Sequence, residues 1–347
     1  MRLLTFRPQK LLIWIFFLGS AMLPAWYHLN KPKIVILHSY DKEYAWVKGV
    51  NAGINRVLEG HREYVVTWYY LDTKRHPLPE FKTNAGMAMR RMLEAAPPDV
   101  LIAIDDDAQA YVTRHLINHP TIKIVFAGVN NALSDYGFDQ AHNVTGILER
   151  IPLAALKETL LLIAQDNQMR TPLTIKFIGD RSETVMGDER YFRSFDMLPV
   201  QVVESSLVET FDEWQQAVRD SAGKVDFLVC SNYRKIKRQT NNPELVPPKE
   251  LIQWTEKHSQ VPLIGTNGFF SQDGGMLAIG TSPFEQGETA AKLALELLIS
   301  NGQANLIPVR TSVQFVVAMR APLIRARQLK LPRVYEAAAR GINEYHE

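Results

Sequence analysis

Acidic, amide and hydroxyl side chains follow one expected strand after another in this sequence. They are Ser39, Tyr40, Asp72, Asp105, Asp106, Asn130, Asn131, Asp180, Tyr233 and Asn267. Parallel strands of an open α/β sheet end on one edge, and ligands bind outside that edge. Convergent polar groups of this kind are typical of a small-molecule site, to which Trp46, at the start of a helix, adds a flat apolar wall. The pattern therefore predicts ligand binding.

Several of these side chains also have a structural alternative. Asp106 or Asp107 can cap the following helix, because an aspartate carboxylate accepts hydrogen bonds from the first backbone N–H groups of a helix. Asn130 suits a turn that needs positive φ. Trp46 suits the core, since aromatic rings bury a large area. His38, beside a buried strand, fits a hydrogen-bonded structural role better than that of a base.

Enzyme signatures are missing from the sequence. It contains no GxSxG, GxxxxGK[ST] or HExxH motif, which are the spacings that serve a nucleophilic serine, a nucleotide phosphate and a catalytic zinc. The run Asp105 to Asp107 resembles a metal site by composition only, because no spaced carboxylate or histidine partner accompanies it. We therefore predict no catalytic residues, no metal and no cofactor.

The elements that must position these residues alternate between strand and helix. Apolar, β-branched runs predict strands at KIVIL, YVVTWYYL, DVLIAI, IKIVFAGV, TIKFIG, VQVVES, VDFLVCSN and VPLIGTN. Between most of them, apolar residues at helical spacing predict helices. This alternation predicts parallel sheets covered on both faces. Because the units outnumber those of one sheet of usual width, we expect two lobes of an α/β protein.

Charge and cysteine content narrow the class of protein. The 347 residues include 39 Lys and Arg against 37 Asp and Glu. Arg2, Arg7 and Lys10 belong to the N-terminal segment discussed next, so the body is near neutral and lacks the basic footprint of a nucleic-acid-binding protein. Cys230 is the single cysteine. It excludes an internal disulfide and suits a small buried apolar residue in its strand.

The N-terminal segment, residues 1–29, has the pattern of an export signal. A basic start precedes the apolar run LLIWIFFLGSAML, in which small residues follow the apolar core, as in a secretory signal peptide. The alternative is a signal anchor that is not cleaved, because the apolar stretch nearly reaches the length of a membrane span. No cysteine near the segment offers a site for lipid attachment. We expect a periplasmic protein, free or tethered to the inner membrane by this leader.

Six stretches together carry a family resemblance. HSYDKEYAW, YYLDTKR, DVLIAIDDDA, VFAGVNN, NVTGILE and TSPFEQGETAAKLALELL occur in this order. They resemble the periplasmic substrate-binding proteins of ABC transporters with a type I periplasmic-binding-protein fold. The branch is the one also found as extracytoplasmic sensor domains of histidine kinases and diguanylate cyclases. The resemblance covers Lys33 to about Pro332.

The resemblance implies two lobes, each a parallel sheet flanked by helices, joined by three crossovers and closing on a ligand like a Venus flytrap. The expected division is 33–128 plus 276–306 for the first lobe and 129–267 plus 308–331 for the second, with 332–347 as a C-terminal tail. Residue by residue, it carries ligand contacts onto Ser39, Tyr40, Trp46, Asp72, Asp105, Asp106, Asn130 and Asn131. Asp180, Tyr233 and Asn267 are added from their places after strands in the second lobe.

The implied function is that of an exported solute-binding protein that presents its closed form to an ABC permease. The alternative is a stand-alone periplasmic sensor subunit acting on a membrane histidine kinase or diguanylate cyclase. No output domain follows in this sequence, so either function needs a separate membrane partner. Nearby acids and aromatic residues suit a cationic or amino-acid-like ligand. The pattern of relatives that bind aromatic amino acids is not clearly present, which leaves the ligand open.

Overall fold

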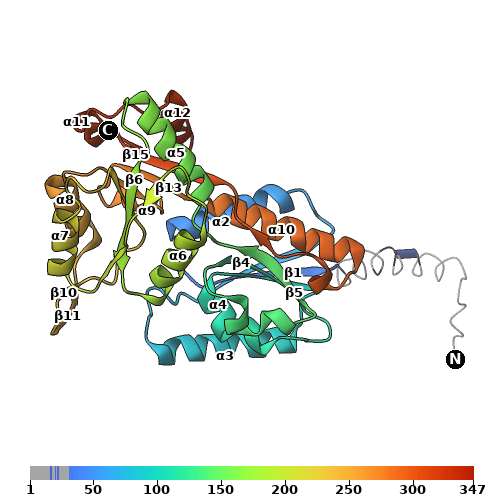
Figure 1. Cartoon of the computed structure of the whole chain (residues 1–347). Helices are drawn as coiled ribbons and strands as arrows, with labels where there is room; N and C mark the ends of the chain where they lie inside the picture. The colour runs from blue at the N-terminus through green and yellow to red at the C-terminus, as the bar shows by residue number, and fades with distance from the viewer. Residues whose placement is uncertain (1–15, 18–19, 21, 23–30) are drawn as a thin grey trace, which may run out of the picture.

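The computed structural model describes residues 16–17, 20, 22 and 31–347. The expected leader, residues 1–29, lies outside this range except for four positions. Within it, no helix is long and apolar enough to cross a membrane. Two β-sheets, each covered by helices on both faces, form two lobes that lie side by side (Figure 1).

The first sheet is entirely parallel, with strand order β14-β5-β4-β3-β1-β2. Its strands are β1 (Lys33–His38), β2 (Val65–Tyr70), β3 (Val100–Ile104), β4 (Lys123–Val129), β5 (Val144–Leu148) and β14 (Arg310–Thr311). Strands β3 and β4 are almost completely buried, as expected for central strands covered on both faces, which read as continuous apolar runs.

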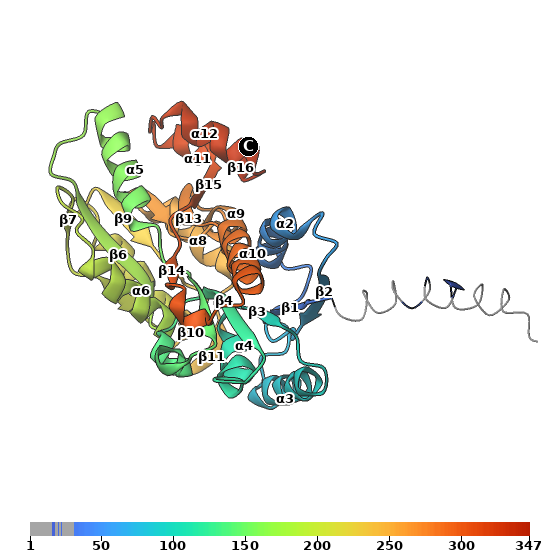
Figure 2. The same cartoon turned by 90° about the vertical axis from the view of Figure 1, so that its right-hand side faces the viewer.

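Helices cover both faces of this sheet. Helices α2 (Ala45–Leu58) and α10 (Pro283–Ser300) pack on one face. Helices α3 (Pro79–Ala95) and α4 (Asp106–Tyr111) pack on the other (Figure 2). Short 3₁₀ turns connect the elements at η1 (Thr113–His115), η2 (Leu133–Tyr136), η3 (Phe138–Gln140) and η4 (Ala304–Leu306).

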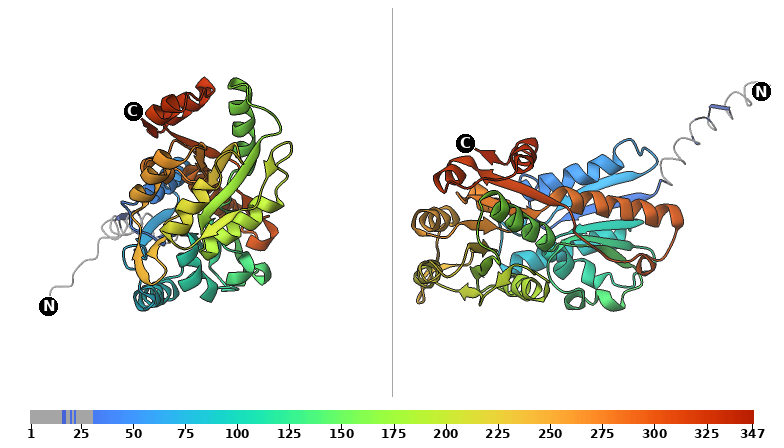
Figure 3. Two further views of the ribbon diagram at one scale, coloured as in Figure 1. Left: turned by 60° about the vertical axis from the view of Figure 1, so that its left-hand side comes forward. Right: turned by 45° about the horizontal axis from the view of Figure 1, so that its top comes forward.

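Helices α2 and α10 come from distant parts of the sequence and touch at their backbones (Figure 3). A Cβ atom built on Gly287 would lie 2.0 Å from the carbonyl oxygen of Val50, and one on Gly53 would lie 2.1 Å from that of Phe284. Only glycine permits so close an approach. This contact fixes α10 in the first lobe.

The second sheet is mixed. Its eight strands are β6 (Thr174–Asp180), β7 (Gln201–Val202), β8 (Ser206–Val208), β9 (Phe227–Cys230), β12 (Leu263–Gly265), β13 (Leu277–Thr281), β15 (Phe315–Arg320) and β16 (Tyr345–His346). Strand β15 runs antiparallel to β13. Strand–helix alternation predicted a wholly parallel sheet, and for this lobe the prediction is wrong. After β13 the chain passes through the first lobe and returns as β15, which therefore enters the sheet in the opposite direction.

Two apolar clusters hold helices on this second sheet. Helices α5 (Leu153–Asp166), α6 (Glu183–Ser194) and α12 (Arg333–Gly341) pack on one face. Helices α7 (Phe211–Arg219), α8 (Pro248–His258) and the short α9 (Phe269–Gln272) pack on the other. Helix α11 (Ala321–Ala326) follows β15, and a hairpin of β10 (Lys237–Gln239) and β11 (Asn242–Leu245) projects beside α7.

The chain passes between the lobes three times: after β5, after β13, and between β14 and β15. The strand pairing moves the expected boundaries. Residues 129–148 belong to the first lobe because β5 pairs with β4, whereas β13 belongs to the second. Residues 332–347 are no detached tail, because Tyr335 and Ala339 of α12 are buried in the core of the second lobe and β16 pairs with β15.

Candidate ligand-binding site

The carboxyl ends of strands from both sheets meet between the lobes. Ser231, directly after β9, donates a hydrogen bond from Oγ to Oδ2 of Asp188 at 2.7 Å. Burial raises the pKa of Asp188, and the charge of Arg150, just after β5, offsets part of that rise. Thr281, at the end of β13, donates from Oγ1 to the carbonyl oxygen of Arg150 at 3.2 Å. These contacts bring the edge predicted to bind ligand in each lobe to the same place.

Asp105 has the most unusual surroundings of the residues at this edge. Its backbone has φ 67° and ψ 164°, a conformation that costs about 1–3 kcal/mol for a residue with a side chain. The side chain is buried, Oδ1 accepts a hydrogen bond from Nε1 of Trp46 at 2.9 Å, and Oδ2 has no partner. Strain and an unpaired buried oxygen at one residue point to a functional group.

Three more carboxyl groups accompany Asp105: those of Asp106 and Glu149, which also follow strands, and that of Asp188, from helix α6. We call the four the strand-end acids. Burial raises the pKa of each of them, to about 8 for Glu149 and to about 6 for Asp188. Repulsion by Glu149 and Asp106 adds to the shift of Asp105. Acids held so close to one another favour a positive charge among them.

An aromatic pair lies next to the strand-end acids. The rings of Tyr40 and Tyr44 meet edge to face with centroids 5.6 Å apart. Burial, and then the charge of Asp105, raise the pKa of Tyr40 well above its usual value. The Nζ atom of Lys74 lies 4.0 Å from the ring centroid of Tyr44 and 4.8 Å from that of Tyr40. The pair thus already accommodates an ammonium group, as cation–π contacts do.

Comparisons with known proteins bear on the fold. No protein-family model and no curated protein matches the sequence. Among solved structures, a ligand-free, open substrate-binding protein with adhesive properties from Clostridium difficile is similar, with 15% identity, a TM-score of 0.61, and coverage of 87% of this chain and 96% of that chain. An ABC domain in complex with L-Trp from Streptococcus pneumoniae has 15% identity, a TM-score of 0.58, and coverage of 89% and 98%.

A third similar structure is a conserved domain protein from Vibrio cholerae O1 biovar El Tor, with 13% identity, a TM-score of 0.58, and coverage of 92% of this chain and 100% of that chain. The chain has a type I periplasmic-binding-protein fold. The fold prediction is therefore confirmed. At these identities the likeness concerns the fold alone.

Within this periplasmic-binding fold, Asp106 serves as a brace for the loop after β4. Its carboxylate accepts hydrogen bonds from the backbone N–H groups of Asn130 and Asn131 at 3.3 Å, and from the hydroxyl of Tyr136 at 2.7 Å. Asn130 in turn donates from Nδ2 to Oε2 of Glu149 at 3.1 Å. These three predicted residues reach the site, where they hold its acids in place.

Ser39 performs the capping expected of Asp106 or Asp107. It is fully buried, donates from Oγ to the carbonyl oxygen of Ile104 at 2.7 Å, and accepts from the backbone N–H of Ala108 at 2.8 Å. Asp107 instead pairs with Lys82, with Nζ and Oδ2 2.9 Å apart. The Ser39 hydroxyl thus both donates and accepts a hydrogen bond inside the protein. It joins the end of β3 to the first turn of α4 and has a structural role.

Asp72 is engaged by its own loop. Arg75 donates from Nε and Nη2 to the two carboxylate oxygens, both at 2.7 Å, and this bidentate hydrogen bonding holds the pKa of Asp72 below its usual value. The backbone of Asp72 is left-handed, with φ 57°, which aspartate tolerates better than most residues. Its carboxylate therefore shapes the loop that carries Lys74.

The second lobe contributes differently from the expectation. Asp180 braces two loops, accepting from the backbone N–H of Ser182 and of Lys235, each at 3.0 Å. Tyr233 lies in the core, where it is fully buried and donates its hydroxyl to Asp273 at 2.8 Å. Asn267 is half-buried after β12, in the position expected for it.

Sequence reasoning missed three residues of the site: Glu149, Arg150 and Asp188. Glu149 and Arg150 follow β5 directly, so the strand-end rule could have found them. Asp188 lies inside helix α6, where nothing in the local pattern distinguishes it. Over the part of the chain that the structure describes, no three His, Cys, Asp or Glu side chains are arranged to hold a metal ion.

Proposed function

We propose that this chain is an exported, non-enzymatic solute-binding protein that encloses a small ligand with an ammonium group between its lobes and presents the closed form to an ABC permease. The observation that carries the proposal is Asp105, with its strained backbone, its buried and unpaired Oδ2 and its hydrogen bond from Trp46. An ammonium group supplies the donor that this oxygen lacks, as buried carboxylates require.

The neighbouring residues support a cation or a zwitterion. Burial raises the pKa of all four strand-end acids, and a bound positive charge would favour their ionised forms. The faces of Tyr40 and Tyr44 already hold the ammonium of Lys74, and Trp46 adds a third ring at the same edge. Arg150 directly follows Glu149 in the sequence. Its Nη1 donates to the carbonyl oxygens of Val129 and Asn130 at 3.1 and 2.9 Å. Held in this way, Arg150 suits the carboxylate of an amino-acid-like ligand.

The ligand can be found by thermal shift with amino acids, polyamines, nucleosides and sugars, since a ligand that binds only the native state raises the melting temperature. We expect hits among compounds with an ammonium group. Asp105→Asn should then weaken binding at least tenfold, because a hydrogen bond to a charged group is worth about 1.5–3 kcal/mol. Asp139→Asn, an exposed aspartate of the first lobe outside the proposed site, is the matched control. Hits confined to neutral sugars, or full affinity in Asp105→Asn, would refute an ammonium ligand.

Closure and export are tested separately. A ligand that binds the closed state better shifts the lobes toward it, so scattering should give a smaller radius of gyration at saturating ligand. Cell fractionation with N-terminal sequencing should place the protein in the periplasm, and cytoplasmic protein beginning at Met1 would refute export. Permease and ATPase genes beside this gene support transport, whereas a histidine kinase or cyclase gene would favour the sensor alternative.

A further inference from the structure

A pocket lies in the second lobe, away from the strand-end acids. Its volume is about 400 Å³, and Lys249, Gln253, Glu256, Lys257, Gln272 and Arg320 are among the residues that line it. This volume lies within the range of small-molecule pockets, roughly 300–1,000 Å³. Helix α8 supplies four of these residues, and Gln272 ends α9.

Strand pairing places this pocket at the opposite end of the sheet from the ligand site. Arg320 is the last residue of β15, which runs antiparallel to β13. Its backbone N–H donates to the carbonyl oxygen of Met276, just before β13 begins, at 2.8 Å. Thr281, which contacts Arg150 at the ligand site, lies at the other end of β13. The pocket is therefore a separate site.

Three cations face this pocket without a carboxylate partner. Among the residues from 31 to 347, neither Lys249, Lys257 nor Arg320 forms an ion pair. Arg320 donates from Nη2 to the carbonyl oxygen of Ser271 at 3.0 Å, but its Nε is buried and has no hydrogen-bond partner. The three cations thus present N–H donors that no carboxylate of the described chain neutralises, and an anion would supply the acceptors.

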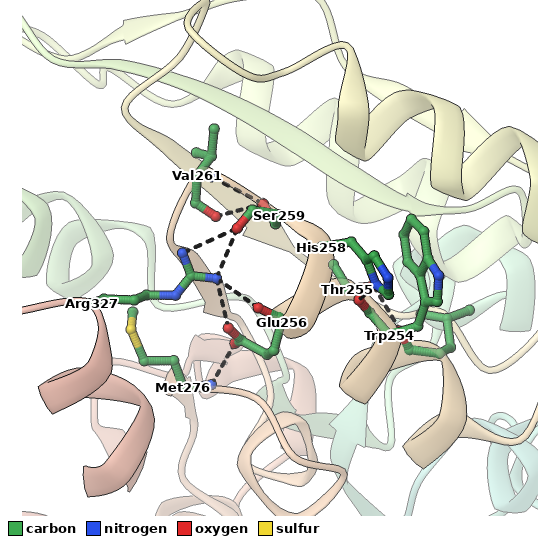
Figure 4. A network of polar contacts seen from close by, with 9 residues as sticks. Trp254, Thr255, Glu256, His258, Ser259, Val261, Met276 and Arg327 are labelled. Atoms are coloured by element: carbon green, nitrogen blue, oxygen red, sulfur yellow. Dashed lines mark hydrogen bonds and ion pairs between the residues drawn. The ribbon is translucent and has the colours of Figure 1, made fainter.

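The one acid of the lining does not balance these charges. The carboxylate of Glu256 is almost fully buried and is held by Arg327, with Nη2 and Oε2 3.0 Å apart, and by the backbone N–H of Met276 at 2.8 Å (Figure 4). Arg327 thus neutralises it. Outside the lining, Oε1 of Glu344 accepts from Nε2 of Gln272 at 2.9 Å, whereas its Oε2 lies 3.6 Å from His346 and is buried without a hydrogen-bond partner.

We propose that this pocket of the second lobe binds a small oxyanion, a phosphate or carboxylate group, through Lys249, Lys257 and Arg320. The amide of Gln253, which makes no hydrogen bond within the part of the chain described, adds a neutral donor to the three cations. Phosphate and carboxylate share the chemistry of several oxygen acceptors around a negative charge, which matches this set of donors. The proposal is independent of the ligand between the lobes.

The test measures melting temperature and calorimetric affinity of the full chain with inorganic phosphate and with citrate, against sodium chloride at matched ionic strength. We expect at least one of the two anions to bind and to stabilise the protein. A response to phosphate alone would identify a phosphate-bearing ligand, and a response to citrate alone a polycarboxylate. Phosphate also stabilises proteins in general because it is excluded from their surfaces, so variants decide the outcome.

The double variant Lys249→Gln, Lys257→Gln should lower anion affinity at least tenfold without touching the half-buried Arg320. Lys224→Gln, an exposed lysine of the same lobe, is the matched control and should bind like the original protein. Asp105→Asn should also keep anion binding, which separates this site from the proposed ligand site. Failure of both anions to bind, or equal responses in the double variant and the control, would overturn the proposal.

Discussion

The indole Nε1 of Trp46 donates a hydrogen bond to Oδ1 of Asp105 at 2.9 Å, joining the start of α2 to the end of β3. The bond turns one oxygen of the carboxylate inward and leaves the other buried and unpaired. Trp46 is therefore both a half-buried core residue and a positioning residue. Packing against the core of the first lobe bears out the core reading of Trp46, and its role as a wall for ligand stays a prediction.

Trp46→Phe should weaken ligand binding by about tenfold, because it keeps an aromatic face but removes a hydrogen bond to a charged group worth about 1.5–3 kcal/mol. Calorimetry with the ligand found in the screen measures the loss. The melting temperature without ligand should also fall, because the buried Oδ1 of Asp105 loses its donor, so affinities are compared at a temperature at which this variant and its control are both folded. Trp254→Phe, in a half-buried position on α8, is the matched control, and equal affinities for the two variants would remove Trp46 from the site.

Glu149 should make the protein less stable as pH rises. Burial raises its pKa to about 8, above the value of about 4.3 in an unfolded chain. Between these values the folded chain holds a proton that the unfolded chain has lost, so the free energy of unfolding falls with rising pH, by less than about 1.4 kcal/mol per pH unit. Urea unfolding of the original protein and of Glu149→Gln from pH 6.5 to 8.5 should show a flatter dependence in the variant.

This pH range avoids two other groups. Burial lowers the pKa of His38 to about 4, below its ordinary value of 6.5, so His38 removes stability only as pH falls from 6.5 toward 4. Asp188, with a pKa of about 6, is mostly ionised above pH 7. Parallel curves for the original protein and Glu149→Gln would show that Glu149 is not protonated in the folded state.

Ser39→Ala should lower the free energy of unfolding by about 1–3 kcal/mol, since it leaves the carbonyl oxygen of Ile104 and the N–H of Ala108 without their buried partner. Denaturant unfolding checks this. Ser194→Ala, an exposed serine whose Oγ donates to the carbonyl oxygen of Tyr191 at 2.8 Å, should cost less. If Ser39→Ala leaves the free energy of unfolding unchanged, water replaces the hydroxyl and Ser39 is free to bind ligand.

Gly287→Ala should destabilise the first lobe by about 3 kcal/mol or more, because the added methyl group would overlap the carbonyl oxygen of Val50 and push α10 away from α2. Gly341→Ala is the matched control, since nothing lies within 4 Å of a Cβ there. Thermal unfolding of both variants measures the difference. Similar melting temperatures would show that the two helices can separate without cost.

The alternation of strands and helices, and the places where polar residues follow the strands, could be predicted from the sequence alone. Central strands such as β3 and β4 are buried on both faces, so their continuous apolar runs predict strands without knowledge of the neighbouring strands. The same local signals located Tyr40, Trp46, Asp105 and Asn130 after strands or at a helix start. The lobe to which β5 belongs could not be predicted from its own residues. Hydrogen bonding to β4 decides it, and the composition of β5 does not.

The role of each polar side chain depends on the tertiary structure. Ser39 caps a helix that begins 67 residues later in the sequence, at Asp106, and Tyr233 turns into the core to meet Asp273. Asp188 reaches the site from within helix α6, whose sequence pattern is that of an ordinary surface helix. A hydroxyl or carboxylate becomes structural when the fold satisfies all its hydrogen bonds and remains available when it does not, and the partners that settle this lie far away in the sequence.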